Sequence, residues 1–229
     1  MARAEPQVAR ASGPPDETAE SGLRALLRGH PAAGVLTIGT FDGVHAGHRA
    51  LVARAAAEAT ARKTQLAAIT FSPRPDTVIS PETALPDICR LDERVARLRA
   101  AGADDVVVVP FTRQLMQLSA QEFMTCLVEE LHAEALCVGE DFALGRQREG
   151  TIPALRHLGI EVIAVPVVKI GGRTAKISSS AIRRAIAAGV PAAPSRFGQP
   201  ALPLSPRRLA VGSADSPAAS QSGWPAQAP

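Results

Sequence analysis

The sequence predicts an α/β protein with a Rossmann-like, doubly wound parallel sheet, and two patterns lead to this prediction. First, five apolar runs of strand length recur along the chain, and they are apolar almost throughout rather than alternating, which is typical of parallel strands buried on both faces. Second, helical patterns separate these runs, and strands that alternate with helices imply crossover connections and a parallel sheet. The predicted strands are Val35–Ile38, Leu66–Thr70, Val106–Val109, Ala135–Val138 and Glu161–Val165.

Three helices are predicted between these strands. In Ala50–Arg62 and in Leu91–Ala101, apolar side chains recur at helical spacing and form one stripe. Gly102 follows the second of these helices, where a C-terminal cap belongs. Ser119 and Glu122 have the spacing of a capping box, which predicts that a third helix begins at this point.

The domain organisation expected from these patterns is a single domain with two extensions. The α/β pattern occupies residues 34–190. Residues 1–33 are expected to be a weakly structured N-terminal extension with one short helix near Ser21–Arg28, where leucines share a face. Residues 191–229 are rich in Pro, Ala and Ser and have no periodicity, so we expect a disordered tail.

Composition argues against several classes of protein. The net charge is only +3 and no concentrated basic face is evident, unlike a nucleic-acid-binding protein. The three cysteines, Cys89, Cys126 and Cys137, form neither a metal-type pair nor a disulfide framework, so we expect small buried side chains in a reducing cytosol. No apolar run approaches the roughly 18 residues of a membrane helix, and the N-terminus lacks the apolar stretch of a signal peptide. We therefore expect a cytoplasmic protein that binds neither nucleic acid nor membranes.

The segment from Gly39 to His48 carries the first chemical signal. It joins the first strand to the first helix, at the sheet edge where doubly wound proteins bind ligands. Its glycines let a ligand approach the backbone, and the following helix N-terminus attracts anions. The imidazoles of His45 and His48 can donate hydrogen bonds to phosphate oxygens as negative charge develops. The glycines are Gly39, Gly43 and Gly47.

Other interpretations of this segment fit its residue types less well. A dinucleotide fingerprint requires Gly-x-Gly-x-x-Gly, whereas these glycines recur every fourth residue. A Walker loop requires Lys after its last Gly, and the nearest candidate, Gly145 to Gly150, is followed by Thr151. A zinc site at His45 and His48 would need further ligands that no Cys or His cluster provides. An ordinary strand-to-helix turn with one capping histidine remains the structural alternative.

A second phosphate-binding pattern runs from Ile177 to Arg183. It contains three consecutive serines, follows a predicted hairpin turn at Gly171-Gly172 and opens a helix. Serine hydroxyls and free N–H groups at a helix start can surround a phosphate. Arg183 is expected on the first turn, where its guanidinium could pair with the same anion. A plain helix cap is the structural alternative.

Together these two segments resemble the nucleotidyltransferase superfamily that carries a His-x-Gly-His signature. The Gly-x-Phe-Asp-Gly-x-His lead-in is similar to that of bacterial FAD synthetases, the FMN adenylyltransferase modules of bifunctional riboflavin kinase/FAD synthetases. The resemblance covers roughly Val35 to Val190, and the second segment resembles the family's Ser-Ser-Thr-x-x-Arg motif with Ser180 in place of Thr. It implies that the catalytic residues, which bind the ATP phosphates and stabilise the α-phosphorus as pyrophosphate leaves, are His45, His48, Ser179, Ser180 and Arg183. It also implies that ATP is contacted by Gly39, Phe41, Gly43, Gly47 and Ser178.

Two further loops resemble the family's flavin-binding segments. Phe71–Pro75 matches Phe-x-Pro-x-Pro, with Arg74 where the family commonly has His, and Arg74 could meet the FMN phosphate. Gly139–Gly145 matches Gly-Glu-Asp-Phe-x-Phe-Gly, with Leu144 where a second Phe is usual. The chain has no Tyr and its one Trp lies in the tail, so rings that stack on the flavin must come from Phe. The implied flavin-binding residues are Phe71, Pro73, Pro75, Asp141, Phe142 and Gly145.

On residue type alone, these loops have simpler interpretations. The two prolines could merely stiffen an extended exit loop, and Asp141 could be a turn-forming residue. Arg146, Arg148 and Lys169 could be solvated surface charges, although the Gly-flanked loop that holds Arg146 and Arg148 could also close over phosphates.

The resemblance implies the reaction of ATP with FMN to give FAD and pyrophosphate, with Mg²⁺ accompanying ATP. The direct ligands of the metal and the oligomeric state are left open. Because no Gly-x-Pro-Thr-Ala-Asn motif of the riboflavin kinase module occurs, we expect kinase activity to be absent. Two alternatives remain: another His-x-Gly-His nucleotidyltransferase with a different acceptor, or a catalytically degenerate flavin- or nucleotide-binding module.

Overall fold

The structure is a computed structural model that describes residues 18–166 and 178–189. The expectations for the hairpin turn at Gly171-Gly172, for Lys169, for Ile177 and for the tail 191–229 lie outside the described residues.

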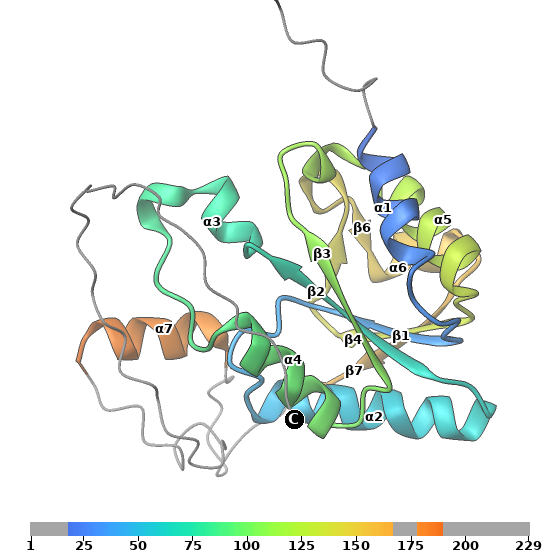
Figure 1. The fold of residues 1–229 in the computed structure, drawn as a ribbon, viewed down its shortest axis with the longest axis horizontal. Helices are drawn as coiled ribbons and strands as arrows, with labels where there is room; N and C mark the ends of the chain where they lie inside the picture. Colours follow the sequence, from blue (N-terminus) through green and yellow to red (C-terminus); the bar gives the residue numbers. More distant parts are fainter. Residues whose placement is uncertain (1–17, 167–177, 190–229) are drawn as a thin grey trace, which may run out of the picture.

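A five-stranded parallel sheet forms the centre of the molecule (Figure 1), which confirms the predicted α/β fold. Its order is β3-β2-β1-β4-β7, so the chain first extends the sheet in one direction from β1 and then returns to extend it in the other. The switch point between β1 and β4 is where such sheets form a ligand crevice at their carboxyl edge. The strands are β1 Val35–Ile38, β2 Leu66–Ser72, β3 Asp105–Pro110, β4 Ala135–Gly139 and β7 Glu161–Val165.

Helices cover both faces of this sheet and bury two separate apolar cores (Figure 1). Neighbouring residues of a strand point to opposite faces, so Leu36 joins one core and Val35 the other. On the Leu36 side lie α1 Ala19–Leu27, α5 Ala120–Leu131 and α6 Ile152–His157; on the Val35 side lie α2 Ala46–Arg62 and α4 Leu91–Ala100.

The remaining described elements are short or lie at the carboxyl edge of the sheet. They are α3 Pro75–Ile79, α7 Ser179–Ala187, the hairpin strands β5 Ala143–Leu144 and β6 Gly150–Thr151, and the 3₁₀ turns η1 Pro81–Thr83, η2 Leu115–Gln117 and η3 Arg146–Arg148.

The predicted helix ends are found where local chemistry marks them. Ser119 and Glu122 form a complete capping box at the start of α5, and Gly102 follows α4 with a φ of +113°, a conformation that suits glycine. The helix predicted from Ala50 begins four residues earlier, at Ala46. Its first turn contains Gly47, which is a poor helix former, so the pattern of apolar residues did not reveal it.

The short helix expected near Ser21–Arg28 is α1, and it belongs to the core. Leu23 and Leu27 are buried against α5 and the sheet. Arg24 adds ion pairs to Glu129 and Glu130 on α5. This part of the expected N-terminal extension is therefore packed onto the domain, because one face of the helix is apolar.

Candidate functional site

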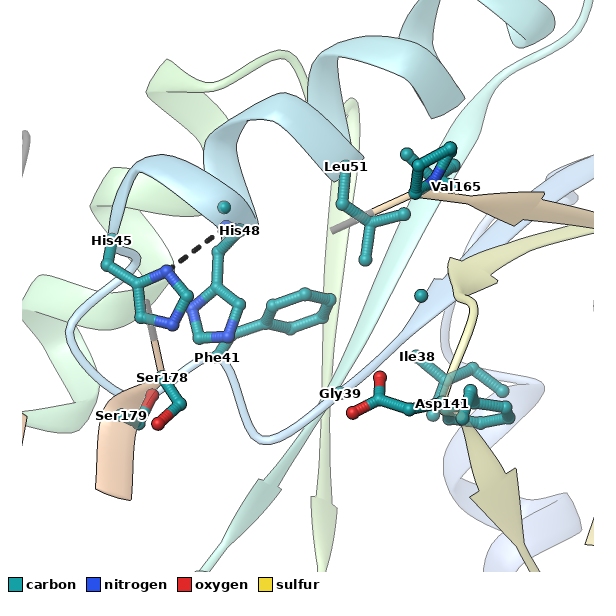
Figure 2. A pocket seen from close by; sticks show the side chains of 14 residues that line it. Ile38, Gly39, Phe41, His45, His48, Leu51, Asp141, Val165, Ser178 and Ser179 are labelled. Atoms are coloured by element: carbon teal, nitrogen blue, oxygen red, sulfur yellow. Dashed lines mark hydrogen bonds between the residues drawn. The ribbon is translucent and has the colours of Figure 1, made fainter. Parts of the chain in front are cut away.

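A cavity of about 250 Å³ opens at the carboxyl ends of β1 and β4, at the switch point of the sheet (Figure 2). Residues from both sequence motifs line it, together with residues that follow β4. From the first motif these are Gly39, Phe41, His45, Gly47 and His48; from the second, Ser178 and Ser179; and after β4, Asp141 and Phe142.

The two histidines form a stacked pair at the start of α2. Their ring centroids lie 3.7 Å apart with an angle of 19° between the planes, and the edge of the Phe41 ring packs against His48. His45 is the N-cap of α2, and its Nδ1 accepts a hydrogen bond of 3.4 Å from the backbone N–H of His48 (Figure 2). Nδ1 acts as an acceptor in this contact, which in the neutral form of the ring places the proton on Nε2.

The environment of His48 favours its neutral form. Burial of the ring lowers the pKa of His48 well below its ordinary value, and the nearby His45 and Arg94 lower it further. The Nδ1 atom of His48 is buried and has no hydrogen-bond partner among the described residues. A buried polar atom of this kind is costly unless a ligand or water satisfies it.

The turn between β1 and α2 has a strained backbone, and hydrogen bonds from arginine side chains stabilise it. Phe41 and Val44 both adopt positive φ angles, of 48° and 44°, which are uncommon for bulky residues and cost about 1–3 kcal/mol each. Arg97 donates to the Gly43 carbonyl at 2.9 Å and Arg49 donates to the Val44 carbonyl at 3.2 Å. The surrounding helices thus impose the conformation that places both imidazoles at the cavity.

The second motif packs directly against this turn. Ser178 is the N-cap of α7, and the hydroxyl of Ser179 donates to the Asp42 carbonyl at 2.9 Å across 137 residues of sequence. Arg183 donates to the carboxylate of Asp42 at 2.8 Å and to the hydroxyl of Ser180 at 3.3 Å. The two motifs therefore converge at one site.

Two details of α7 differ from the sequence-based expectation. Since α7 starts at Ser179, Arg183 begins its second turn rather than lying on the first. Ser180 is exposed and does not line the cavity, so it contacts the site through Arg183.

The residues expected to bind flavin are separated by the fold. Asp141 and Phe142 line the cavity, whereas Phe71 packs edge-on against Phe111 beside the hydrophobic core. The segment is extended up to Arg74, since Phe71 and Ser72 end β2 and Arg74 has extended backbone angles, and Pro75 is the first residue of α3. Pro73 and Gly145 do not line the cavity, and a Cβ on Gly145 would lie 2.5 Å from the backbone nitrogen of Ala120. Contact of these six residues with flavin stays a prediction.

The suggestion that Arg74 meets the FMN phosphate is wrong in this structure. Its side chain is fully buried and ion-paired with Asp42, Asp76 and Asp87. It also donates to the Leu85 carbonyl. The guanidinium points into the protein because these oxygens surround it.

Asp42 and Arg94 are buried charged residues beside the site that sequence reasoning did not identify. Asp42 accepts from Arg183 and from the backbone N–H groups of Ile88 and Cys89. Arg94 donates to the Phe71 carbonyl at 2.9 Å and lowers the pKa of His48. One signal was available: Arg94 falls on the same helical stripe as Leu91 and Leu98, where an apolar residue would be expected.

The loop that carries Arg146 and Arg148 lies next to the cavity. Both arginines are exposed in η3, and Arg148 donates to the Asp141 carbonyl at 3.3 Å. Its neighbour Glu149 points the other way and accepts from the N–H of Ala120 at the start of α5.

All three cysteines are buried and unpaired, as expected. Burial raises the pKa of Cys89 and Cys126, and raises the pKa of Cys137 to about 11. Cys89 accepts a hydrogen bond from the Gly43 N–H, so it packs beneath the β1–α2 turn.

A family model described as FAD synthetase matches residues 28–181, which include the first motif, the three serines of the second and the residues that line the cavity. The chain belongs to the FAD synthetase family. Curated bifunctional riboflavin kinase/FMN adenylyltransferases are similar to it: those of Escherichia coli K12 (36% identical, 72% of this chain and 54% of the relative), Pseudomonas fluorescens (37%, 73% and 54%) and Bacillus subtilis (30%, 76% and 56%). The chain thus spans about half the length of these relatives.

Among solved structures, a crystal structure described as a macrolide-efflux protein from Streptococcus pneumoniae superposes with a TM-score of 0.66. It is 30% identical in sequence, and the match covers 75% of this chain and 57% of that one. The described part of the chain contains no helix long and apolar enough to cross a membrane. Nor do its described residues group three or more His, Cys, Asp or Glu side chains where they could hold a metal ion.

Proposed function

We propose that this FAD synthetase family member is an FMN adenylyltransferase, which joins ATP and FMN into FAD and releases pyrophosphate. The convergence of His45, His48 and Ser179 at one cavity, with Arg183 held beside it by Asp42, carries the proposal. Asp141 and Phe142 line the same cavity from β4, on the side assigned to the acceptor. The curated relatives described as bifunctional riboflavin kinase/FMN adenylyltransferases support this choice of substrates.

The nucleotide side of the cavity is suited to a triphosphate. The helices α2 and α7 both begin there, and neither has an acidic residue in its first turn, so their free N–H groups remain available to an anion. In the proposal, His45 and His48 donate to the phosphate oxygens, and Arg183 adds a guanidinium from α7. Gly39 and Gly47 line the cavity and allow the nucleotide to approach the backbone.

The neutral state of His48 is consistent with this role. Its pKa is lowered in the absence of a ligand, and a bound polyanion favours the protonated ring. As charge develops on the oxygens around the α-phosphorus, a donor fixed at the site stabilises the transition state by roughly 3–4 kcal/mol.

The transfer itself needs no strong general base. The FMN phosphate is already an anionic nucleophile, and one of its oxygens attacks the α-phosphorus in line while the bond to the β-phosphate oxygen breaks. The site therefore contributes positioning and charge stabilisation. Magnesium would enter as part of the ATP substrate and balance charge on the phosphates. Phe142 is the ring available to stack on isoalloxazine at the cavity, with Asp141 orienting the flavin.

One assay tests the proposal. Purified protein is incubated with ATP, Mg²⁺ and FMN, and the products are separated by chromatography. Formation of FAD and pyrophosphate in equal amounts is expected. ATP and FMN binding without turnover would instead indicate a degenerate binding module, and ATP binding with no response to FMN would indicate a different acceptor.

A further inference from the structure

Asp42 lies at the junction of four segments around the site. One of its carboxylate oxygens accepts from the N–H groups of Ile88 and Cys89, at 2.9 and 3.4 Å. The other accepts from Arg183 at 2.8 Å and from Arg74 at 3.4 Å. The side chain of Asp42 is completely buried. A buried carboxylate with this many donors has its orientation fixed by its neighbours.

Arg74 is the buried cation that accompanies this carboxylate. Its side chain has no exposed surface, and it lies within ion-pair distance of three carboxylates, those of Asp42, Asp76 and Asp87. The Nε atom lies 2.6 Å from Asp87, in an ion pair whose geometry is not that of a hydrogen bond. Without Arg74, the buried carboxylate of Asp42 would have Arg183 as its cationic partner. The positive charge of Arg74 therefore helps to neutralise the carboxylates at this junction.

Arg183 is therefore positioned by the carboxylate of Asp42, and Arg74 contacts the same carboxylate. Arg74 contacts Asp42 from the loop after β2, and Arg183 contacts the same oxygen from α7. Arg183 is only one-tenth exposed, and its Nη2 lies 3.5 Å from Asp76, which also pairs with Arg74. Both carboxylates that contact Arg183 are thus shared with Arg74.

We infer that Arg74 is a positioning residue for nucleotide binding: it fixes Asp42 and Asp76 so that these carboxylates hold Arg183, and with it the start of α7, against the β1–α2 turn. This inference rests on the proposed function for the assignment of Arg183 to ATP. Arg74 stands where the family commonly has His, in a loop that was expected to bind the flavin. The inference instead gives Arg74 a role in binding the nucleotide. The side chain of Arg74 is fully buried, whereas Arg183 keeps one-tenth of its side chain exposed, so Arg74 acts through Arg183 rather than on a substrate.

The test is a double-mutant cycle between Arg74 and Arg183, measured as the affinity for ATP with Mg²⁺ by calorimetry. Arg74→Met is expected to weaken ATP binding about tenfold, the scale of one hydrogen bond between charged groups. In the Arg183→Met background the same substitution is expected to cause little further loss, since the residue through which it acts has gone. Equal losses in both backgrounds would overturn the inference.

Steady-state kinetics add a measurement that would not change if Arg74 only stabilised the fold. Arg74→Met is expected to raise the KM for ATP while leaving the KM for FMN within about twofold, because the cavity-lining acceptor residues are untouched. A rise confined to the KM for FMN would show that Arg74 serves the acceptor and would refute the inference.

Conservative variants keep the test decisive if Arg74→Met fails to fold. Arg74→Lys retains a cation and is expected to keep most of the ATP affinity, whereas Arg74→His, the residue common in the family, is expected to lie between Lys and Met. If Arg74→Lys lost as much ATP affinity as a folded Arg74→His protein, the positive charge at residue 74 would not account for the effect, and the inference would be contradicted. Arg54→Met is the matched control, because Arg54 lies on the exposed face of α2 and pairs only with Glu58 in the described structure.

The binding measurement also separates this inference from the proposed function. If the wild-type protein makes no FAD but binds ATP, non-additivity between Arg74 and Arg183 would still support the positioning role, while the acceptor assignment would fail.

Discussion

The helices α5 and α2 begin at the same edge of the sheet, but different kinds of side chain accept hydrogen bonds from the N–H groups at their N-termini. At α5, Ser119 and Glu122 form a capping box, and Glu149 accepts a further hydrogen bond from the N–H of Ala120. At α2, the cap is His45, whose Nδ1 makes a longer contact of 3.4 Å, and the first turn has no acidic residue. One helix start is saturated by carboxylates of the protein, and the other is surrounded by imidazoles.

This difference separates a structural helix start from one suited to a ligand. Carboxylates at α5 satisfy its free N–H groups and interact favourably with the helix dipole. The same groups at α2 would repel a phosphate. At α2 the buried Nδ1 of His48 has no hydrogen-bond partner among the residues that the structure describes, so it can still bond to a ligand. Substitutions at α2 should therefore change activity, and those at α5 should change stability.

The largest effect is expected for His48→Ala. Loss of a donor aimed at the α-phosphate should lower kcat for FAD formation by about 100-fold to 1000-fold. The fold should remain, because the helix cap is provided by His45 and the Nδ1 of His48 has no hydrogen-bond partner in the described part of the chain. Turnover is measured with ATP and FMN, and folding by circular dichroism and thermal melting. Wild-type rates in a folded His48→Ala protein would contradict the assigned role.

A smaller effect on activity is expected for Ser179→Ala. The substitution removes the hydroxyl that ties α7 to the Asp42 carbonyl and that faces the cavity. We expect ATP affinity to fall about tenfold, corresponding to one hydrogen bond of roughly 1.4 kcal/mol. The free energy of unfolding should change little, since alanine is the better helix former. Calorimetric titration with ATP and a urea unfolding curve separate the two quantities; unchanged affinity would remove Ser179 from the site.

Ser119→Ala is the matched serine substitution at the structural helix start. Loss of the capping box should lower the free energy of unfolding by about 1 kcal/mol. Turnover of the folded protein should not change, because Ser119 is half-buried at the start of α5 and does not line the cavity. Urea unfolding and the FAD assay measure these two effects. A drop in kcat without loss of stability would break the distinction between the two helix starts.

The two helix starts should also lose stability in different pH ranges. The pKa of His48 is lowered in the folded state, so below its ordinary value near 6.5 the unfolded chain takes up a proton that the folded protein resists, and stability falls. The pKa of Glu122 is lowered by its hydrogen bonds to Ser119, so its contribution is present above about 4.5 and is lost as the pH falls below that value.

The smallest predicted effects follow from these two lowered pKa values. His48→Gln should reduce the loss of stability between pH 7 and 5, and Glu122→Gln should reduce the loss below about pH 4.5. Melting temperatures across this range measure both. If His48→Gln left the pH 7 to 5 slope unchanged, the lowered pKa of His48 would not contribute to acid sensitivity.

Short-range patterns in the sequence determined the strands, most helix ends and the positions of both motifs. The strands Val35–Ile38 and Glu161–Val165 are found as predicted, and the capping box at Ser119 is complete. These features depend on a few neighbouring residues: an apolar run makes a buried strand, and a serine with a glutamate three positions later satisfies a helix start.

Only the tertiary structure decided which charged groups are buried and what they contact. Asp42, Arg74 and Arg94 look like ordinary polar residues in the sequence, yet all three are buried at the site. Phe71 and Phe142 were equal candidates to face the flavin; the fold packs both rings against the same core, and of the two Phe142 alone also lines the cavity. A charged side chain is buried only where partners distant in the chain neutralise it, and local sequence does not specify those partners.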